Sequence, residues 1–349
     1  MSKQPHVLVI PYPAQGHVAP LLKLATKIAE HGIKVTFVNT EFIEAKVMAS
    51  IPEKAEGWSL IKFVSISDGI ERDDDRKDFD KTRNTMLRVM PEQITCVIAD
   101  ISVRWALEVA QNLGVSRAAF IPYGPANLAL SFHVTKMIED GILDSNGNPM
   151  NDWLISISEG TLPWKRNEFC WSCRGNEKMQ KILFESICAV VQFVNISNWV
   201  LSNSFYELDP SSCDLVPNIL PIGKIVEWAA QEKVLAHPSV TCFVSHCGWN
   251  STLEGLSMGV PFLCWPYFVD QYQNRNFICE AWKIGLNLCP DRNGIVTRHE
   301  IQTKVTKLLS DEGIKRNALK LKGTAINSLV EGGSSFENFE RFIVEMKSS

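Results

Sequence analysis

Two side chains in the first hundred residues lie where open parallel sheets bind ligands. His17 follows an apolar run, His6 to Ile10, after a short loop, and Asp100 closes a second apolar run that begins at Ile94. Both positions follow the carboxyl end of a strand, so the histidine is well placed for acid–base chemistry. A carboxylate at that edge could orient an imidazole and stabilise its cation. The alternatives are a local hydrogen bond for His17 and a helix N-cap for Asp100.

A second polar cluster lies at a later strand-to-helix junction. Residues 245–254 read SHCGWNSTLE, with small and polar side chains where the helix is expected to start. Free backbone N–H groups and the positive end of the helix dipole make such a junction a phosphate site. Asn250 and Ser251 would add amide and hydroxyl donors, so a diphosphate is the expected ligand. The alternative is that Ser251 and Glu254 form only a capping box.

The elements that must position these residues alternate between strand and helix. The start reads as a strand at His6 to Ile10, a helix opening at Pro20 and stopped by Gly32, and a strand from Val35 to Val38. This order predicts a parallel sheet with helices on both faces. Further strands are expected at 94–99, 118–121, 199–201, 240–245 and 260–265, and further helices at 102–112 and 251–258. Loops and amphipathic helices are expected over 124–185, and a linker at 211–223. A capping box at Thr297 and Glu300 is expected to start a later helix.

Composition narrows the class of protein. A chain of 349 residues, 45% hydrophobic and 21% charged, indicates two ordinary globular domains. The net charge of −4 argues against nucleic acid or an anionic membrane surface as partner. No apolar run suits a secretion signal or a membrane span. Several of the ten cysteines lie in apolar runs, where they read as core residues rather than as disulfide partners, so we expect a cytoplasmic protein. The acidic run at Asp73 to Asp75 reads as a solvated loop rather than a cation site.

Three stretches of the sequence resemble one family. Trp228 to Gln271 reads WAAQEKVLAHPSVTCFVSHCGWNSTLEGLSMGVPFLCWPYFVDQ, which looks like the signature box of plant secondary-product UDP-glycosyltransferases. The stretches HVLVIPYPAQGHVAPLLKLA and ITCVIADISVRWALEVAQNLG resemble the N-terminal domain of that family. The resemblance implies an α/β, GT-B fold: two Rossmann-like domains facing each other across a cleft. Residues 1–223 would bind the acceptor and a shortened domain at 224–349 the UDP-sugar.

The resemblance also implies a role for each matching residue. His17 would be the general base on the acceptor hydroxyl and Asp100 the carboxylate that steadies it. The reaction would invert the sugar carbon, with UDP-glucose as donor, a small hydroxylated molecule as acceptor, and no metal or other cofactor. For the nucleoside of the donor, the resemblance implies Trp228 on the uracil, Gln231 beside the nucleoside and Glu254 on the ribose. For the diphosphate it implies His246, Gly248, Asn250 and Ser251, and for the sugar Trp249, Asp270 and Gln271. A Gln at the end of the box, here Gln271, generally goes with glucose in this family.

The sequence departs from the family just before the box. Family members carry a long stretch of strands and helices between the linker and the box, whereas here Gly223 is followed almost at once by Trp228. Loss of central parallel strands is expected to expose apolar strand edges and favour self-association. Two alternatives therefore stay open: a working UDP-glucosyltransferase whose remaining strands close up, or a noncatalytic remnant with a partial UDP-sugar site.

Overall fold

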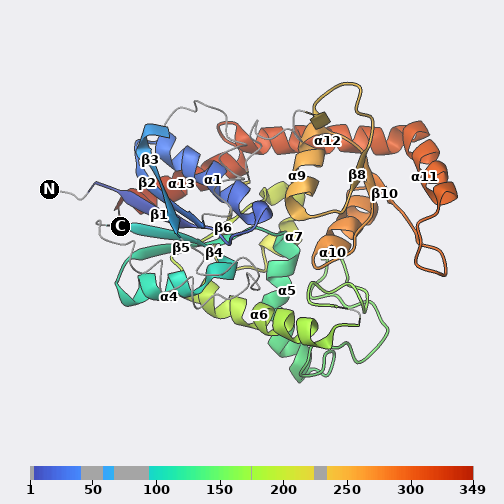
Figure 1. The fold of residues 1–349 in the computed structure, drawn as a ribbon, viewed down its shortest axis with the longest axis horizontal. Helices are drawn as coiled ribbons and strands as arrows, with labels where there is room; N and C mark the ends of the chain where they lie inside the picture. Colours follow the sequence, from blue (N-terminus) through green and yellow to red (C-terminus); the bar gives the residue numbers. More distant parts are fainter. Residues whose placement is uncertain (1–3, 41–57, 67–93, 174, 224–233, 349) are drawn as a thin grey trace.

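The larger of two parallel sheets forms the left part of the molecule in Figure 1. The computed structural model describes residues 4–40, 58–66, 94–173, 175–223 and 234–348. The strands of this sheet are β1 (His6–Ile10), β2 (Lys34–Thr40), β3 (Ile61–Ile66), β4 (Cys96–Asp100), β5 (Ser116–Ile121), β6 (Trp199–Ser202) and β7 (Ile219–Pro221). They pair in the order β3-β2-β1-β4-β5-β6-β7, every pair parallel, as the strand–helix alternation predicts.

Helices cover both faces of the large sheet because its strands are apolar on both sides. In β1, Val7 and Val9 pack under α1 (Gln15–Glu30) and α13 (Ser334–Ser348). Leu8 and Ile10 point to the other face. That face is covered by α4 (Trp105–Asn112), α5 (Pro125–Glu139) and α6 (Glu177–Ile196).

A smaller parallel sheet lies beside the first, in the order β10-β9-β8. Among the described residues β8 and β10 are its edge strands, and Val244 in β8 is 54% exposed. An exposed apolar edge of this kind is what a loss of neighbouring strands would leave. The elements of this part are β8 (Phe243–Ser245), α9 (Trp249–Met258), β9 (Phe262–Cys264), α10 (Gln271–Asn276), a π-helical turn at Phe277–Ala281, β10 (Gly285–Asn287), α11 (Arg298–Ser310) and α12 (Glu312–Leu329).

We call the large sheet with its helices the large-sheet half and the elements from β8 to α12 the small-sheet half. The chain returns to the large-sheet half in α13, whose Phe342, Ile343 and Met346 are buried in the core beside α1. The domain boundary at residue 223 stays a prediction. Short helical segments complete the fold at Trp58–Leu60, Ile101–Val103, Tyr206–Leu208 and α7 (Pro210–Cys213).

Most predicted elements differ from the structure by up to three residues at an end, and two predictions are wrong by more. The helix expected to open at Pro20 begins at Gln15, with Pro20 inside it. The expected linker at 211–223 contains the end of α7 and strand β7, which is too short and proline-rich to show a strand period but pairs with β6. The predicted stop at Gly32 is confirmed by its φ of 74°, a conformation that favours glycine.

Helix α6 differs from the expectation that no segment suits a membrane. By length and composition alone it could cross one, with a mean hydropathy of 1.3 over its most apolar window, of which 22% is buried. Its residues Val190, Phe193 and Val194 nevertheless pack into the core under the large sheet. Core helices of soluble proteins pass the same test, so the composition of α6 alone does not establish a span.

The return of α13 yields a stability prediction. Phe342 is fully buried and meets Trp199 of β6 edge-on, with ring centroids 5.3 Å apart. Replacing Phe342 by Ala should lower the free energy of unfolding by about 3–5 kcal/mol, because it leaves a cavity between helix and sheet. Val344→Ala, on the exposed side of the same helix, should change it by less than about 0.5 kcal/mol. Chemical denaturation measures both, and equal effects would contradict the packing of α13.

Candidate active site

The two residues proposed for acid–base chemistry lie in contact. His17 stands in the first turn of α1 and Asp100 is the last residue of β4. Parallel pairing of β1 with β4 brings the carboxyl ends of both strands to one edge, where Ile10 lies opposite Ala99. His17 Nδ1 and Asp100 Oδ2 are 2.8 Å apart, with the Asp100 side chain fully buried and that of His17 29% exposed. The imidazole of His17 thus lies between the buried carboxylate and the protein surface.

Asp100 performs both roles that the sequence left open. Its Oδ2 pairs with His17, and its Oδ1 accepts a hydrogen bond of 2.8 Å from the backbone N–H of Ser102, capping the short helix that follows β4. A carboxylate can only accept, so the Nδ1 of His17 carries the hydrogen in this pair. In the neutral ring the lone pair is then on Nε2, which can accept a proton from a bound molecule.

The electrostatic surroundings of His17 favour its cation. Burial is the largest single influence and lowers the pKa of His17. The charge of Asp100, its hydrogen bond and the charge of Asp270 together outweigh that effect, so the pKa lies above its ordinary value of 6.5. Tyr12 packs beside the imidazole, with ring centroids 4.9 Å apart. Charge and packing therefore hold the ring in one orientation.

The junction between β8 and α9 has the tight geometry expected of a phosphate loop. Cys247 has a φ of 66°, and its N–H donates to the hydroxyl of Ser245 at 3.0 Å. A Cβ on Gly248 would lie 2.4 Å from His246 Nε2, so a larger residue there would displace the imidazole from its present position. Gly248 is the N-cap of α9 and no side chain caps that end, so the alternative capping box of Ser251 and Glu254 is wrong. The Ser251 side chain lies in the first turn instead.

Helix α9 contacts the large-sheet half at a carbonyl of α1 that lacks the usual hydrogen-bond donor within its own helix. Pro20 has no N–H, so it cannot donate to the carbonyl of Gly16 four residues earlier. The side-chain amide of Asn250 donates to that carbonyl instead. The Oδ1 of Asn250 accepts from Asn203 Nδ2 at 2.9 Å, and Trp249 Nε1 donates to the Asn203 carbonyl at 2.7 Å. Both first residues of α9 therefore bind the large-sheet half.

Close packing confirms the position of α9 between the two sheets (Figure 1). A Cβ on Gly124, in the loop after β5, would lie 2.9 Å from the Trp249 ring. Burial lowers the pKa of His246, which precedes this helix, so its imidazole favours the neutral form. The start of α9 thus lies beside the edge of the sheet that carries His17 and Asp100.

The predicted sugar-contacting residues lie at the start of α10. Asp270 immediately precedes the helix and accepts a hydrogen bond of 2.8 Å from Asn274 Nδ2. Burial raises the pKa of Asp270, although Asn274 and His17 act in the opposite direction. Gln271 Oε1 accepts from the backbone N–H groups of Tyr267 and Phe268, each at 3.0 Å. Asp270 is therefore electrostatically linked to His17 across the two halves.

The structure unites part of the predicted site and adds a residue. Trp228 and Gln231 lie outside the described residues, as do Asp73 to Asp75. Glu254 is half-buried on α9. Sequence reasoning missed Asn203, although its place directly after β6, at the carboxyl edge of the sheet, could have indicated it. In the described ranges no group of three His, Cys, Asp or Glu side chains could hold a metal ion.

The His17–Asp100 contact yields a titration prediction. In the unaltered protein we expect an NMR titration of the His17 ring to give a pKa above 6.5. Asp100→Asn should lower it, because the carboxylate charge that favours the imidazolium is lost while burial remains. By linkage, the raised pKa adds stability that is present below pH 6.5 and is lost as the pH rises through the folded-state pKa. The His17→Gln spectrum identifies the signal, and an unchanged pKa in Asp100→Asn would contradict the pairing.

Comparisons with known proteins identify the family to which the sequence is similar. The family described as UDP-glucoronosyl and UDP-glucosyl transferase matches residues 195–327, and the glycosyltransferase N-terminal domain matches residues 4–67. UDP-glycosyltransferase 83A1 of Arabidopsis thaliana is 32% identical, with 99% of this chain and 97% of the relative covered. That alignment extends over 451 residues, more than the 349 of this chain, so the relative has residues without a counterpart here.

A solved structure extends the likeness to the fold. UGT2 of Phytolacca americana, solved with UDP-2fluoro-glucose and pterostilbene, superposes with a TM-score of 0.84 at 17% identity, covering 99% of this chain and 100% of the other. At that identity the likeness concerns the fold, which is the GT-B arrangement of two Rossmann-like parts. Sequence and fold together show that this chain belongs to the plant family 1 UDP-glycosyltransferases, which are transferase enzymes.

Proposed function

We propose that this chain transfers glucose from UDP-glucose to a hydroxyl group of a small molecule, with inversion at the sugar carbon. The observation that carries the proposal is the 2.8 Å contact between His17 and the buried Asp100, at a sheet edge that faces the start of α9. A hydroxyl is a weak nucleophile at neutral pH, so transfer needs a base and a donor held in place. The two halves supply one requirement each.

In the proposed reaction His17 Nε2 accepts the proton of the acceptor hydroxyl. The acceptor oxygen attacks the anomeric carbon from the side opposite the diphosphate, and the bond between that carbon and the UDP oxygen breaks. Asp100 stabilises the imidazolium that forms, since it is buried and within hydrogen-bond distance. Negative charge develops on the leaving UDP, and N–H groups at the start of α9 are suited to stabilise it.

The donor contacts in this proposal follow the family resemblance. His246, Gly248, Asn250 and Ser251 surround the diphosphate, while Trp249, Asp270 and Gln271 contact the sugar. The solved neighbour with UDP-2fluoro-glucose supports a UDP-hexose donor, and the closing Gln271 supports glucose. The amide of Asn250 already binds Gly16, so its contact with phosphate would be made from a side chain that the large-sheet half holds in place.

The proposal extends to the remaining expectations. The reaction uses no metal, following the resemblance, and takes place in the cytoplasm. The acceptor is a small hydroxylated molecule, a class supported by the pterostilbene bound to the solved neighbour. Its pocket would be formed by the loops after Pro122 and the segment from Trp153 to Trp171, and an apolar lining is expected for such a ligand.

The proposed base leads to a kinetic prediction. His17→Ala should lower the rate of glucose transfer by about 10²–10⁴-fold, the usual contribution of a general base, and leave UDP affinity nearly unchanged. His31→Ala is the control, because it removes an imidazole at the other end of α1 that pairs with Glu340. Transfer assays with UDP-glucose and calorimetry with UDP test both variants. Loss of UDP binding together with activity would count against the role of His17.

A second candidate is a noncatalytic remnant that keeps the motif. It is favoured by the exposed Val244 at the edge of β8 and by the longer alignment of the Arabidopsis relative. A small-sheet half without its missing neighbours would then bind UDP-sugar poorly or not at all. The two candidates differ in one measurable property, the binding of UDP.

Thermal unfolding with and without UDP separates the candidates. A ligand that binds only the folded state adds about 2.7 kcal/mol at a concentration one hundred times its Kd. For the working enzyme we expect one cooperative transition that moves upward with excess UDP. Adenosine diphosphate at the same concentration is the control and should have a smaller effect. A transition that UDP does not move would favour the remnant.

A further inference from the structure

Helix α10 is polar in sequence yet almost fully buried. Its sequence is QYQNRN, and the exposed fractions are 8% for Gln271, 0% for Gln273, 1% for Asn274 and 1% for Asn276. Burying an amide without a hydrogen-bond partner is costly, so such side chains are expected to be satisfied by neighbours. A short helix of this composition depends on those neighbours for its position.

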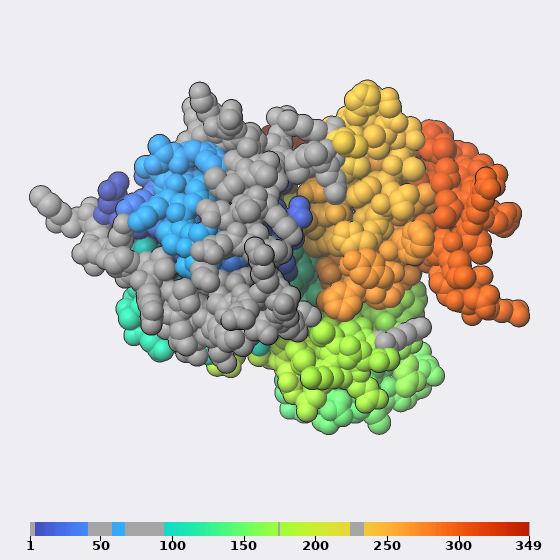
Figure 2. Space-filling model, in the orientation of Figure 1, coloured from blue at the N-terminus to red at the C-terminus, as the bar shows by residue number. Residues whose placement is uncertain are grey.

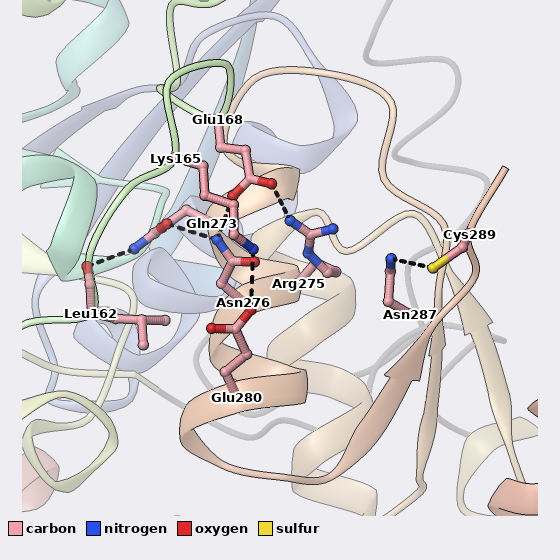
Figure 3. A network of polar contacts seen from close by, with 9 residues as sticks. All are labelled: Leu162, Lys165, Glu168, Gln273, Arg275, Asn276, Glu280, Asn287 and Cys289. Carbon is pink, nitrogen blue, oxygen red and sulfur yellow. Dashed lines mark hydrogen bonds and ion pairs between the residues drawn. The ribbon is translucent and has the colours of Figure 1, made fainter. Parts of the chain in front are cut away.

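The neighbours on one side belong to the segment between α5 and α6 in the large-sheet half. Glu168 uses both carboxylate oxygens: Oε1 lies 2.5 Å from Arg275 Nη2, and Oε2 accepts from Asn276 Nδ2 at 2.7 Å (Figure 3). Gln273 Nε2 donates to the Leu162 carbonyl at 3.2 Å. Figure 2 shows the yellow-green residues of this segment lying against the orange residues of the small-sheet half.

The ion pair of Glu168 with Arg275 is shielded from water. Their side chains are 14% and 12% exposed. Charge-assisted hydrogen bonds are stronger than neutral ones, and burial reduces their screening. Phe277, in the turn after α10, packs with Trp164 and Phe169 in one apolar cluster. The polar contacts and the apolar cluster join the same two segments, so Glu168 has a fixed geometry.

The other side of α10 carries the proposed sugar contacts. Asn274 Nδ2 donates both to Asp270 Oδ2 and to the carbonyl of Cys247 in the loop before α9. Gln271 holds the backbone of Tyr267 and Phe268. A shift of α10 would therefore move Asp270 and Gln271 relative to both the phosphate loop and His17.

We propose that Glu168 is a positioning residue for the sugar donor. Through Arg275 and Asn276 it fixes α10, and thereby Asp270 and Gln271, at a set distance from the base on the opposite half. Glu168 touches no reacting group in this proposal, which rests on the proposed function in assigning the sugar to Asp270 and Gln271. Its removal should impair the use of UDP-glucose while sparing UDP, because UDP lacks the sugar.

Glu168→Gln tests the proposal, with Glu280→Gln as a matched control. Glu280 pairs with Lys165 at 3.3 Å and joins the same two segments, but the side chains of Glu280 and Lys165 are 52% and 50% exposed. That pair should therefore contribute little to holding the segments together. Glu168→Gln should lower kcat by about 10–100-fold, the scale expected when reacting groups are misplaced. It should also weaken the binding of UDP-glucose but not the binding of UDP. Glu280→Gln should stay within about twofold of the unaltered protein in each quantity.

Hydrogen exchange of residues 270–276 provides a readout that does not depend on the donor. Exchange there should be faster in Glu168→Gln than in Glu280→Gln. Unchanged exchange, or an equal loss of affinity for UDP and UDP-glucose, would overturn the inference. If Glu168→Gln does not fold, Arg275→Lys keeps the charge but loses the planar fork, and the same two outcomes decide.

The outcome also distinguishes this inference from the proposed function. If the unaltered protein binds UDP-glucose and transfers glucose while Glu168→Gln keeps the same preference for UDP-glucose over UDP, only the inference fails. If the unaltered protein binds no UDP-glucose, the proposed function fails, and the sugar role of α10 is overturned with it. The double variant Glu168→Arg with Arg275→Glu restores an ion pair and should recover part of the lost preference.

Discussion

The carboxylate of Asp100 is fully buried, and the architecture around it follows from the donors that a buried charge requires. One donor is the backbone of Ser102, supplied by the chain itself as it turns after β4. The other is His17, which reaches Asp100 only because β1 and β4 are direct neighbours in the sheet. The helix carrying His17 must also begin close to the end of β1, and its early start at Gln15 meets that requirement.

The small-sheet half depends on the large-sheet half for part of its core. Phe205 and Leu208, which follow β6, are buried in the same cluster as Leu256 and Phe262. Trp282 Nε1 donates to the Leu208 carbonyl at 3.2 Å. A three-stranded sheet has little surface with which to bury a core, so these contacts replace part of what further strands would supply. The proposed phosphate loop between β8 and α9 is thus supported by residues outside its own sheet.

Much of the fold and the centre of the site could be predicted from local pattern. Apolar runs ended by polar residues at strand ends indicated the sheet and brought His17 and Asp100 to one edge. The start of α1 was mispredicted because Pro20 has the local features of a first helical residue. In the structure Pro20 lies inside the helix, and the Gly16 carbonyl to which it cannot donate accepts a hydrogen bond from Asn250, far along the chain. Glu168 could not be found at all, since its partners lie more than a hundred residues away and carry no shared spacing.

Pro20, Asn250 and Glu168 show that contacts between the halves carry the geometry on which transfer would depend. The proposed base belongs to the large-sheet half and the proposed donor loops belong to the small-sheet half, so the reacting atoms could meet only if the two halves are held at a fixed separation. At the start of α9 this register comes from Asn250 and Trp249, and at α10 from Glu168. None of these contacts involves a strand of the small sheet. These contacts would therefore keep the loops that face His17 in place even if the small sheet lacks strands that its relatives have, provided that the large-sheet half remains folded.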